Sequence, residues 1–157
     1  MIQTRTTAVV FAALLALSPA ASALDGQKAL YVGGTVSAKV PENSEGRLDT
    51  TNDKKLVFVS EKGDRAELPY ARIESFEYGQ KASHRIKTAI FLTPWSLFSK
   101  KRKHYVSLLW KDTAGKEQGA VFELGHDLLR PTVMLLEART GKKLTFQDEE
   151  SKKNYAK

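Results

Sequence analysis

The sequence of 157 residues contains no cysteine. Disulfide bonds, thiolate catalysis and cysteine-ligated metal centres are therefore excluded. Small exported domains often depend on disulfides because their hydrophobic cores are small, so this chain has to be held together by packing alone. The three histidines stand at positions 84, 104 and 126, which is not the spacing of a metal site on a helix. The sequence predicts neither a metal nor another cofactor.

A long apolar run is also missing. The apolar run Ala8–Leu17 is about half as long as the ~20 residues that a transmembrane helix needs. Arg5 precedes it, and Ala21-Ser22-Ala23 follows as an A-x-A cleavage site, so residues 1–23 are typical of a secretory signal. We expect cleavage near Ala23, a periplasmic or secreted protein, and no transmembrane helix in the mature chain.

Recognisable catalytic motifs are absent as well. The chain has no G-x-S-x-G elbow, and Gly33-Gly34 lacks the third glycine and the following helix of a dinucleotide-binding fingerprint. The neighbouring acids Asp148, Glu149 and Glu150 lie in a polar tail, where nothing would desolvate them and shift their pKa values. We therefore expect a protein that is not an enzyme.

Acidic residues are missing from one whole stretch, Lys81–Lys111, which contains eight Lys or Arg. The rest of the chain after residue 23 contains 16 basic and 18 acidic residues, so the basic surplus lies entirely in this stretch. A positive field concentrated beside aromatic residues favours an anionic partner, whereas diffuse positive charge indicates little. This stretch is therefore the predicted contact surface.

Within the stretch, the apolar block Ala89–Phe98 is followed by four consecutive cations. In a membrane interpretation, the aromatic residues enter the interface and the cations bind anionic lipid phosphates or another envelope component. Pro94 interrupts any long helix, so the block would dip into the surface rather than span it. The candidate contact residues are Phe91, Trp95, Phe98, Lys100, Lys101, Arg102 and Lys103.

Other interpretations of the same block remain open. Ala89–Leu92 could be a core strand and Trp95–Phe98 a cover over one end of a barrel, with the following lysines a solvated edge that discourages aggregation. The block could instead be an apolar patch for a protein partner or for a homodimer. Nucleic acid is not expected, because Tyr105 and Trp110 fall in a strand whose alternation is explained by core packing.

Most of the remaining sequence alternates with period two and has turn residues every 8–12 positions, which predicts one β-rich domain over residues 24–147. In Leu30–Val40 the alternation places Val32, Gly34, Val36, Ala38 and Val40 on one face. A hairpin turn at Asp112–Lys116 is expected between the last two strands. The expected strands are Leu30–Val40, Arg47–Thr51, Lys55–Ser60, two pieces of Arg65–Tyr78 separated by Pro69, His104–Lys111 and Glu117–Leu124.

One amphipathic helix is predicted after these strands. Asp127 is the expected N-cap, Pro131 falls in the first turn, and Gly141 is placed to end the helix in a left-handed conformation. Leu128, Leu129, Val133, Leu135 and Leu136 form its apolar face. The tail, residues 148–157, has no apolar pattern and is predicted to be disordered.

Three segments resemble known proteins: PYARIESFEYG, SLFSKKRKHYVSLLW and AVFELGHDLLRPTVMLLEARTGKK. The order of elements resembles a pleckstrin-homology-like (PH-like or GRAM-like) domain, and the segments resemble a family of uncharacterised exported bacterial proteins over most of Leu30–Phe146. The resemblance implies a mainly β (α+β) fold, a small antiparallel barrel or sandwich of about six to seven strands. Its C-terminal helix would plug one end through Leu129, Val133 and Leu136. The chain lacks the basic signature that such domains use for inositol phosphates, so that activity is not implied.

Overall fold

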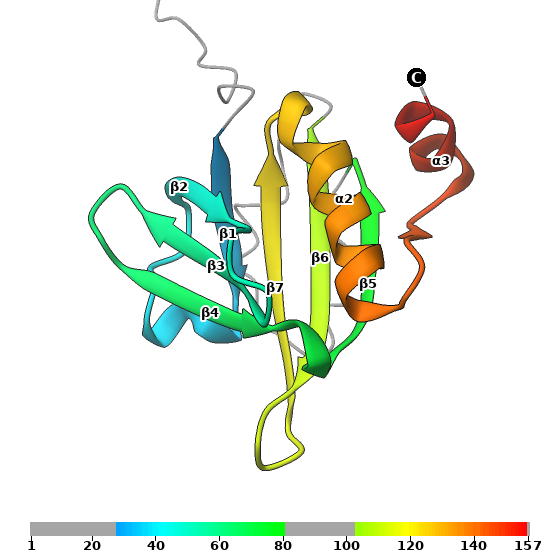
Figure 1. The fold of residues 1–157 in the computed structure, drawn as a ribbon. Coiled ribbons are helices and arrows are strands. Elements are labelled where there is room, and N and C mark those ends of the chain that lie inside the picture. The colour runs from blue at the N-terminus through cyan, green and yellow to red at the C-terminus, as the bar shows by residue number, and fades with distance from the viewer. Residues whose placement is uncertain (1–27, 81–102, 157) are drawn as a thin grey trace, which may run out of the picture.

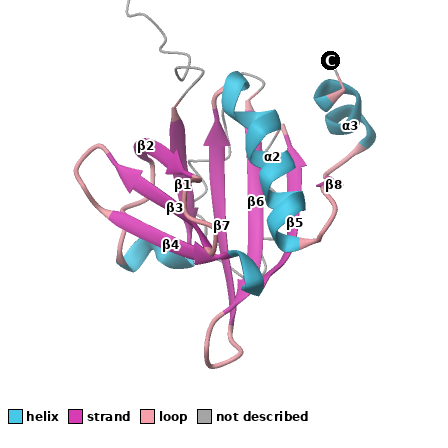
Figure 2. Cartoon of the chain, in the orientation of Figure 1, coloured by secondary structure: helices cyan, strands magenta, loops and turns pink. Residues whose placement is uncertain are grey.

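The computed structural model describes residues 28–80 and 103–156, which form a mainly β, α+β fold (Figures 1 and 2). The strands of this part are β1 (Ala29–Gly34), β2 (Ser44–Asp49), β3 (Lys55–Ser60), β4 (Arg65–Pro69), β5 (Ile73–Gly79), β6 (His104–Lys111), β7 (Glu117–Leu124) and β8 (Thr145–Phe146). The helices are α2 (His126–Thr140) and α3 (Glu149–Tyr155), together with the 3-10 turns η1 (Thr35–Ala38) and η2 (Tyr70–Arg72). None of the helices described here is long and apolar enough to cross a membrane.

The strands form one sheet in the order β4-β3-β2-β1-β7-β6-β5-β8. Neighbours pair antiparallel, except for the short β8, which runs parallel to β5. The expected mainly β, α+β class is confirmed, but a closed barrel is wrong because the sheet is open. One physical reason is the chain between β4 and β5: Pro69 ends β4 and lacks an N–H donor, and η2 leads directly into β5 without pairing the two strands.

The open sheet is strongly curved. In the sheet order, β3 and β7 are separated by β2 and β1, yet the ring of Phe58 on β3 lies 5.5 Å from the ring of Phe122 on β7. Tyr31 on β1 contacts both rings, at 6.2 and 5.6 Å between centroids. Figure 1 shows the same bend, because β3 and β4 cross the direction of β5, β6 and β7. The main core fills the concave side of this bend.

Helix α2 covers the concave side (Figure 1). Leu129, Val133 and Leu136 are at most 3 % exposed and belong to the main core, as the sequence predicts. The helix begins at His126 with Gly125 as its N-cap, so Asp127 lies in the first turn and the prediction of an Asp127 cap is wrong. Gly141 ends the helix with φ of 68°, and its N–H donates to the carbonyl of Glu137. This C-terminus agrees with the sequence pattern.

The prediction of one strand over Leu30–Val40 is only partly correct. The pairing of β1 with β7 shifts register between Tyr31 and Gly33, and η1 follows at Thr35. As a result, Val32 belongs to a small second cluster with Tyr105 and Val121, whereas Val40 is buried in the main core. Gly34 explains the break: its φ is 144°, and a Cβ at this position would lie 2.2 Å from the carbonyl oxygen of Gly119.

The polar tail also differs from the prediction of disorder. Residues Glu149–Tyr155 form α3, whose N-cap Asp148 accepts a hydrogen bond from the Ser151 N–H at 2.7 Å. Acidic residues stand in its first turn and Lys152 and Lys153 in its last, which suits the helix dipole. Tyr155 then packs its ring 5.6 Å from Phe146 of β8. Capping and one aromatic anchor give this short segment its order.

Candidate functional site

The ends of two paired strands mark where the acid-free stretch joins the sheet. Strand β5 ends at Gly79 and β6 begins at His104, and Gly79 pairs with Tyr105. The chain therefore leaves and re-enters the sheet at neighbouring positions. Several charged or titratable side chains gather at this end of the sheet. We call them the base cluster: Tyr78, Lys103, His104, Glu123 and His126.

Lys103 is the one predicted contact residue that lies in the described part of the chain. Its Nζ is 2.8 Å from Oε2 of Glu123, whose side chain is only 7 % exposed. Glu123 lies on β7, where it pairs with Tyr105 of β6 and Leu30 of β1. A buried carboxylate requires a charged partner or several hydrogen bonds. The structure therefore places Lys103, itself 32 % exposed, in a partly buried ion pair, a role that the sequence pattern did not reveal.

The other half of the base cluster is a chain of rings. The hydroxyl of Tyr78 lies 2.8 Å from Nδ1 of His104, and the ring of His126, in the first turn of α2, lies 5.6 Å from that of His104. Burial lowers the pKa of His104, and the neighbouring His126 lowers it further. When His104 is neutral with its proton on Nε2, its Nδ1 accepts a hydrogen bond from the Tyr78 hydroxyl. These residues come together because β5 ends, and β6 and α2 begin, at the same end of the sheet.

Helix α3 borders this cluster. The ring of Tyr155 lies 5.5 Å from that of Tyr78, and the guanidinium of Arg130 lies 5.4 Å from the Tyr155 ring centroid. Arg130 also donates to the Tyr155 carbonyl at 2.8 Å, and the Asn154 amide donates to Oε1 of Gln80 at 3.0 Å. The last helix is thereby attached to the residue that precedes the acid-free stretch. Sequence reasoning missed this contact because it treated the tail as disordered.

The base cluster offers ion pairing and proton binding. Burial raises the pKa of the Tyr105 phenol, and the nearby Glu123 carboxylate raises it further. In residues 28–80 and 103–156 there is no group of three or more His, Asp or Glu side chains that could hold a metal ion. The ion pair of Lys103 with Glu123 and the hydrogen bond of Tyr78 with His104 fix the ends of β5 and β6 where the acid-free stretch joins the sheet.

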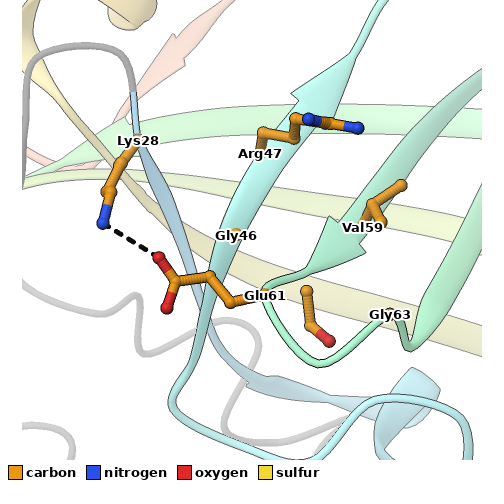
Figure 3. Close-up of a pocket in the computed structure, with 7 residues that line it drawn as sticks. Lys28, Gly46, Arg47, Val59, Glu61 and Gly63 are labelled. Carbon is orange, nitrogen blue, oxygen red and sulfur yellow. Dashed lines mark hydrogen bonds and ion pairs between the residues drawn. The ribbon is translucent and has the colours of Figure 1, made fainter.

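Two shallow hollows lie elsewhere on the described surface. The first, of about 410 Å³, lies beside β2 and the β3–β4 turn, and Lys28, Arg47, Val59 and Glu61 contribute to its walls (Figure 3). Lys28 binds Glu61 at 2.9 Å, so the charges of these two wall residues cancel (Figure 3). The second, of about 540 Å³, is bordered by Arg72, Glu74, Lys111, Asp112 and Lys142. Lys111 binds Glu74 in it at 3.0 Å.

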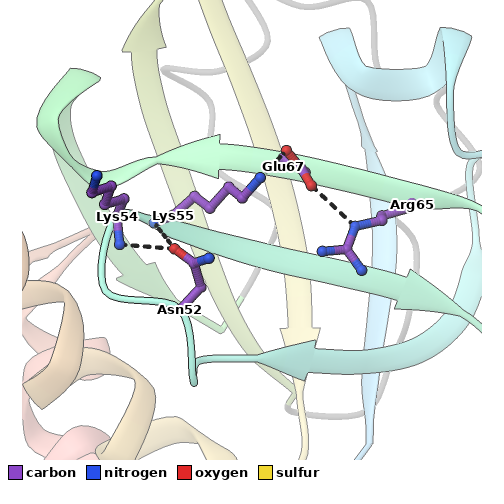
Figure 4. A network of polar contacts seen from close by, with 5 residues as sticks. All are labelled: Asn52, Lys54, Lys55, Arg65 and Glu67. Atoms are coloured by element: carbon purple, nitrogen blue, oxygen red, sulfur yellow. Dashed lines mark hydrogen bonds and ion pairs between the residues drawn. The ribbon is translucent and has the colours of Figure 1, made fainter.

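The outer face of β3 and β4 carries a polar network in which cations are also paired with an acidic side chain (Figure 4). Lys55 and Arg65 both bind the carboxylate of Glu67. Hydrogen bonds from these two cations lower the pKa of the Glu67 carboxyl. Oδ1 of Asn52 accepts from the backbone N–H groups of Lys54 and Lys55 at 2.9 and 3.1 Å and shapes the turn before β3. This face therefore presents paired charges.

The remaining predicted contact residues lie outside the described residues: Phe91, Trp95, Phe98, Lys100, Lys101 and Arg102. The structure describes the base cluster to which their segment is joined, not these side chains. The scan against protein-family models and the search of curated proteins both found no match to this chain.

Proposed function

We propose that this chain is a non-enzymatic, exported binding domain that attaches to an anionic membrane or envelope surface through its acid-free basic segment. The observation that carries the proposal is the separation of charge along the chain. Residues 28–80 and 103–156 contain 17 basic and 17 acidic residues, whereas residues 81–102 contain six basic residues and no acid. The net positive charge is thus concentrated in one segment.

Ion pairing in the described part strengthens this contrast. Acidic partners bind Lys28, Lys55, Arg65, Lys103, Lys111, Arg139 and Lys143. Cations that are paired within the fold add little to long-range attraction, because their fields are cancelled nearby. The six basic residues at 81–102 have no acid within their own segment. Each cation near an anionic lipid surface contributes ~1 kcal/mol, and this contribution falls as salt screens it.

The fold supports the same proposal at a general level. The support is the order β4-β3-β2-β1-β7-β6-β5 followed by a helix across the concave side, from which we infer a PH-like domain, although the sheet is open and not the expected barrel. We include this fold assignment in the proposal. A PH-like fold serves many purposes, so the charged segment and not the fold indicates the ligand class.

Vesicle binding tests the proposal. The mature chain is mixed with vesicles of zwitterionic lipid alone and with vesicles that contain about 30 % anionic lipid. We expect binding only to the anionic vesicles, with an affinity that falls at least roughly tenfold between about 50 and 300 mM salt. A triple variant with Lys100→Gln, Lys101→Gln and Arg102→Gln should lose most of this binding.

The matched control removes three exposed cations elsewhere, Lys62→Gln, Lys152→Gln and Lys153→Gln. It changes the net charge by the same amount but leaves the basic segment intact, so it should keep most of the binding. Equal losses in both triple variants would show that net charge alone is responsible and would refute the assignment to residues 81–102. Absence of binding at low salt would refute the membrane form of the proposal.

Export is the second part of the proposal and rests on the leader-like residues 1–23. It predicts that the protein recovered from the periplasm or the medium begins at Leu24. Mass spectrometry of the N-terminal peptide measures this directly, and a periplasmic or secreted protein that keeps Met1 would contradict cleavage.

A further inference from the structure

The face of the sheet that points away from α2 is apolar and buried. Side chains alternate along a strand, so Tyr105, Ser107 and Leu109 of β6 point away from the side that holds Val106, Leu108 and Trp110. We call the side to which Tyr105, Ser107 and Leu109 point the rear face. Its apolar members are Leu30, Val32, Tyr105, Leu109 and Val121. Val121 is 0 % exposed, Val32 is 2 % exposed and Tyr105 is 5 % exposed. An antiparallel sheet with one solvated face would not bury these residues.

The elements of the described part do not account for this burial. Helix α2 packs on the concave side, and η1 contributes Val36 to that same main core. Among the described hydrophobic residues, only Leu30 and Leu109 pack against the second cluster, and both belong to the sheet itself. The consecutive buried residues of β6 and β7 are typical of strands that are covered on both sides. A further apolar layer is required.

We propose that the block Ala89–Phe98 of the same chain packs against the rear face. The block is apolar at seven of its ten positions. Its segment starts beside Gly79 and ends beside Tyr105, the first rear-face residue of β6. The connecting residues 80–88, at up to ~3.3 Å each, can reach along the whole of β6, which has eight residues.

Charge complementarity favours the same occupant. The carboxylates of Glu77 on β5 and Glu123 on β7 lie on the rear face, opposite Ser107 and Tyr105 of β6, and Oε1 of Glu77 is buried without a hydrogen-bond partner among the described residues. The segment that we place there has six basic residues and no acid. Lys103, at its C-terminal end, already binds Glu123. A second copy of this chain is the competing occupant, and it would have to meet the same two acidic groups.

The two parts of the predicted contact surface then have different roles. The apolar block is part of the fold, and the cations around it supply the attraction to an anionic surface. Packing of the block does not depend on the proposed function, because its test is made in buffer without any ligand. A negative result here would leave the vesicle experiment unaffected, and the reverse also holds.

Tryptophan fluorescence tests the packing of the block, because the chain contains only Trp95 and Trp110. In the Trp110→Phe variant of the mature chain, Trp95 should emit as a buried indole in buffer, resist quenching by acrylamide, and shift to longer wavelength in denaturant. If this variant unfolds, the difference between the spectra of the wild type and Trp95→Phe gives the same information. Emission in buffer equal to that of the denatured chain would overturn the proposal.

A truncation on the rear face is a second test, and a truncation on the exposed face of α2 is its matched control. Leu109→Ala should loosen the contact, so that quenching of Trp95 rises severalfold while far-UV circular dichroism stays unchanged. Met134→Ala, on the exposed face of α2, should have no effect on Trp95. Sedimentation is measured in parallel. A buried Trp95 in a strict monomer supports the proposal, whereas burial that appears only with dimer formation assigns the rear face to a second copy and overturns it.

Discussion

The guanidinium of Arg139 on α2 lies 2.8 Å from the carboxylate of Asp53, in the turn between β2 and β3. The same side chain donates to the Asn52 carbonyl at 2.7 Å and lies 5.4 Å from the ring centroid of Tyr70 in η2. It thus joins the end of the helix to the β2–β3 turn and to η2, the connection between β4 and β5. Asp53 is 88 % exposed, so solvent weakens the ion pair, and the carbonyl and ring contacts account for most of the stabilisation.

Arg139→Gln should therefore lower the free energy of unfolding by about 1–2 kcal/mol, because it removes a charge-assisted hydrogen bond and a cation–π contact together. Asp53→Asn should cost less than about 0.5 kcal/mol, since it removes only the exposed ion pair. Urea denaturation of the two variants measures both values. An equal loss in both would mean that the ion pair dominates, contrary to our expectation.

Glu123→Gln should destabilise the fold by about 1–3 kcal/mol, because the ammonium of Lys103 loses its carboxylate beside a buried strand. The matched variant is Glu74→Gln, which removes an ion pair with Lys111 in which both side chains are 49 % exposed. This control should cost less than about 1 kcal/mol. Thermal or urea unfolding compares the two, and a control as damaging as Glu123→Gln would argue against the importance of burial.

Stability should fall as the pH drops below the unfolded-state pKa of histidine, about 6.5. Burial and the neighbouring His126 lower the pKa of His104 in the folded state, so the unfolded chain binds this proton more readily. The contribution of His104 is therefore complete above pH ~6.5 and is lost as the pH falls through the folded pKa. Free energies of unfolding measured at about pH 5, 6, 7 and 8 should show this slope.

His104→Gln is the test of that assignment. The variant should have a smaller decrease in stability between about pH 7 and 5 than the wild type. The lowered pKa values of the Asp49 and Asp112 carboxyl groups act below pH ~4 and do not contribute to this window. An unchanged slope in His104→Gln would assign the effect to other groups.

Gly141→Ala should destabilise the chain by about 1 kcal/mol, because the residue has φ of 68° and a Cβ is disfavoured in that conformation. A Cβ added to Gly141 would meet no atom within 4 Å, so the cost arises from the backbone and not from a clash. Gly141→Asn should cost less, since asparagine tolerates the left-handed region. Urea denaturation separates the two. Equal stability of wild type and Gly141→Ala would refute the conformational argument.

Periodicity predicted the central part of the fold well. His104–Lys111 and Glu117–Leu124 are strands with the expected bounds, and their alternation assigns Val106 and Tyr105 to opposite sides. Pro69 separates two strands as expected. These features depend on side-chain period and on the missing proline donor, both of which are local properties of the sequence.

Features that depend on distant contacts were missed. The ion pair of Lys103 with Glu123 depends on the register between β6 and β7, and the Tyr78–His104 hydrogen bond depends on the pairing of β5 with β6. The break in β1 arises from the close approach of Gly34 to Gly119, which no local pattern reveals. For α3, however, the sequence contained a signal. Asp148 can cap the N-terminus of a helix, the two acids after it suit the positive end of the helix dipole, and Lys152 and Lys153 suit the negative end.

The strand order also has a consequence for how the chain folds. Every pairing among β1–β7 joins strands that are consecutive in sequence, except that of β1 with β7, which joins residues as distant as Ala29 and Leu124. The two halves of the sheet, β1–β4 and β5–β7, can therefore form from local contacts. Their union at β1–β7 must close a loop of most of the chain and bears the largest entropic cost. That pairing is the step at which we expect the rate of folding to be determined.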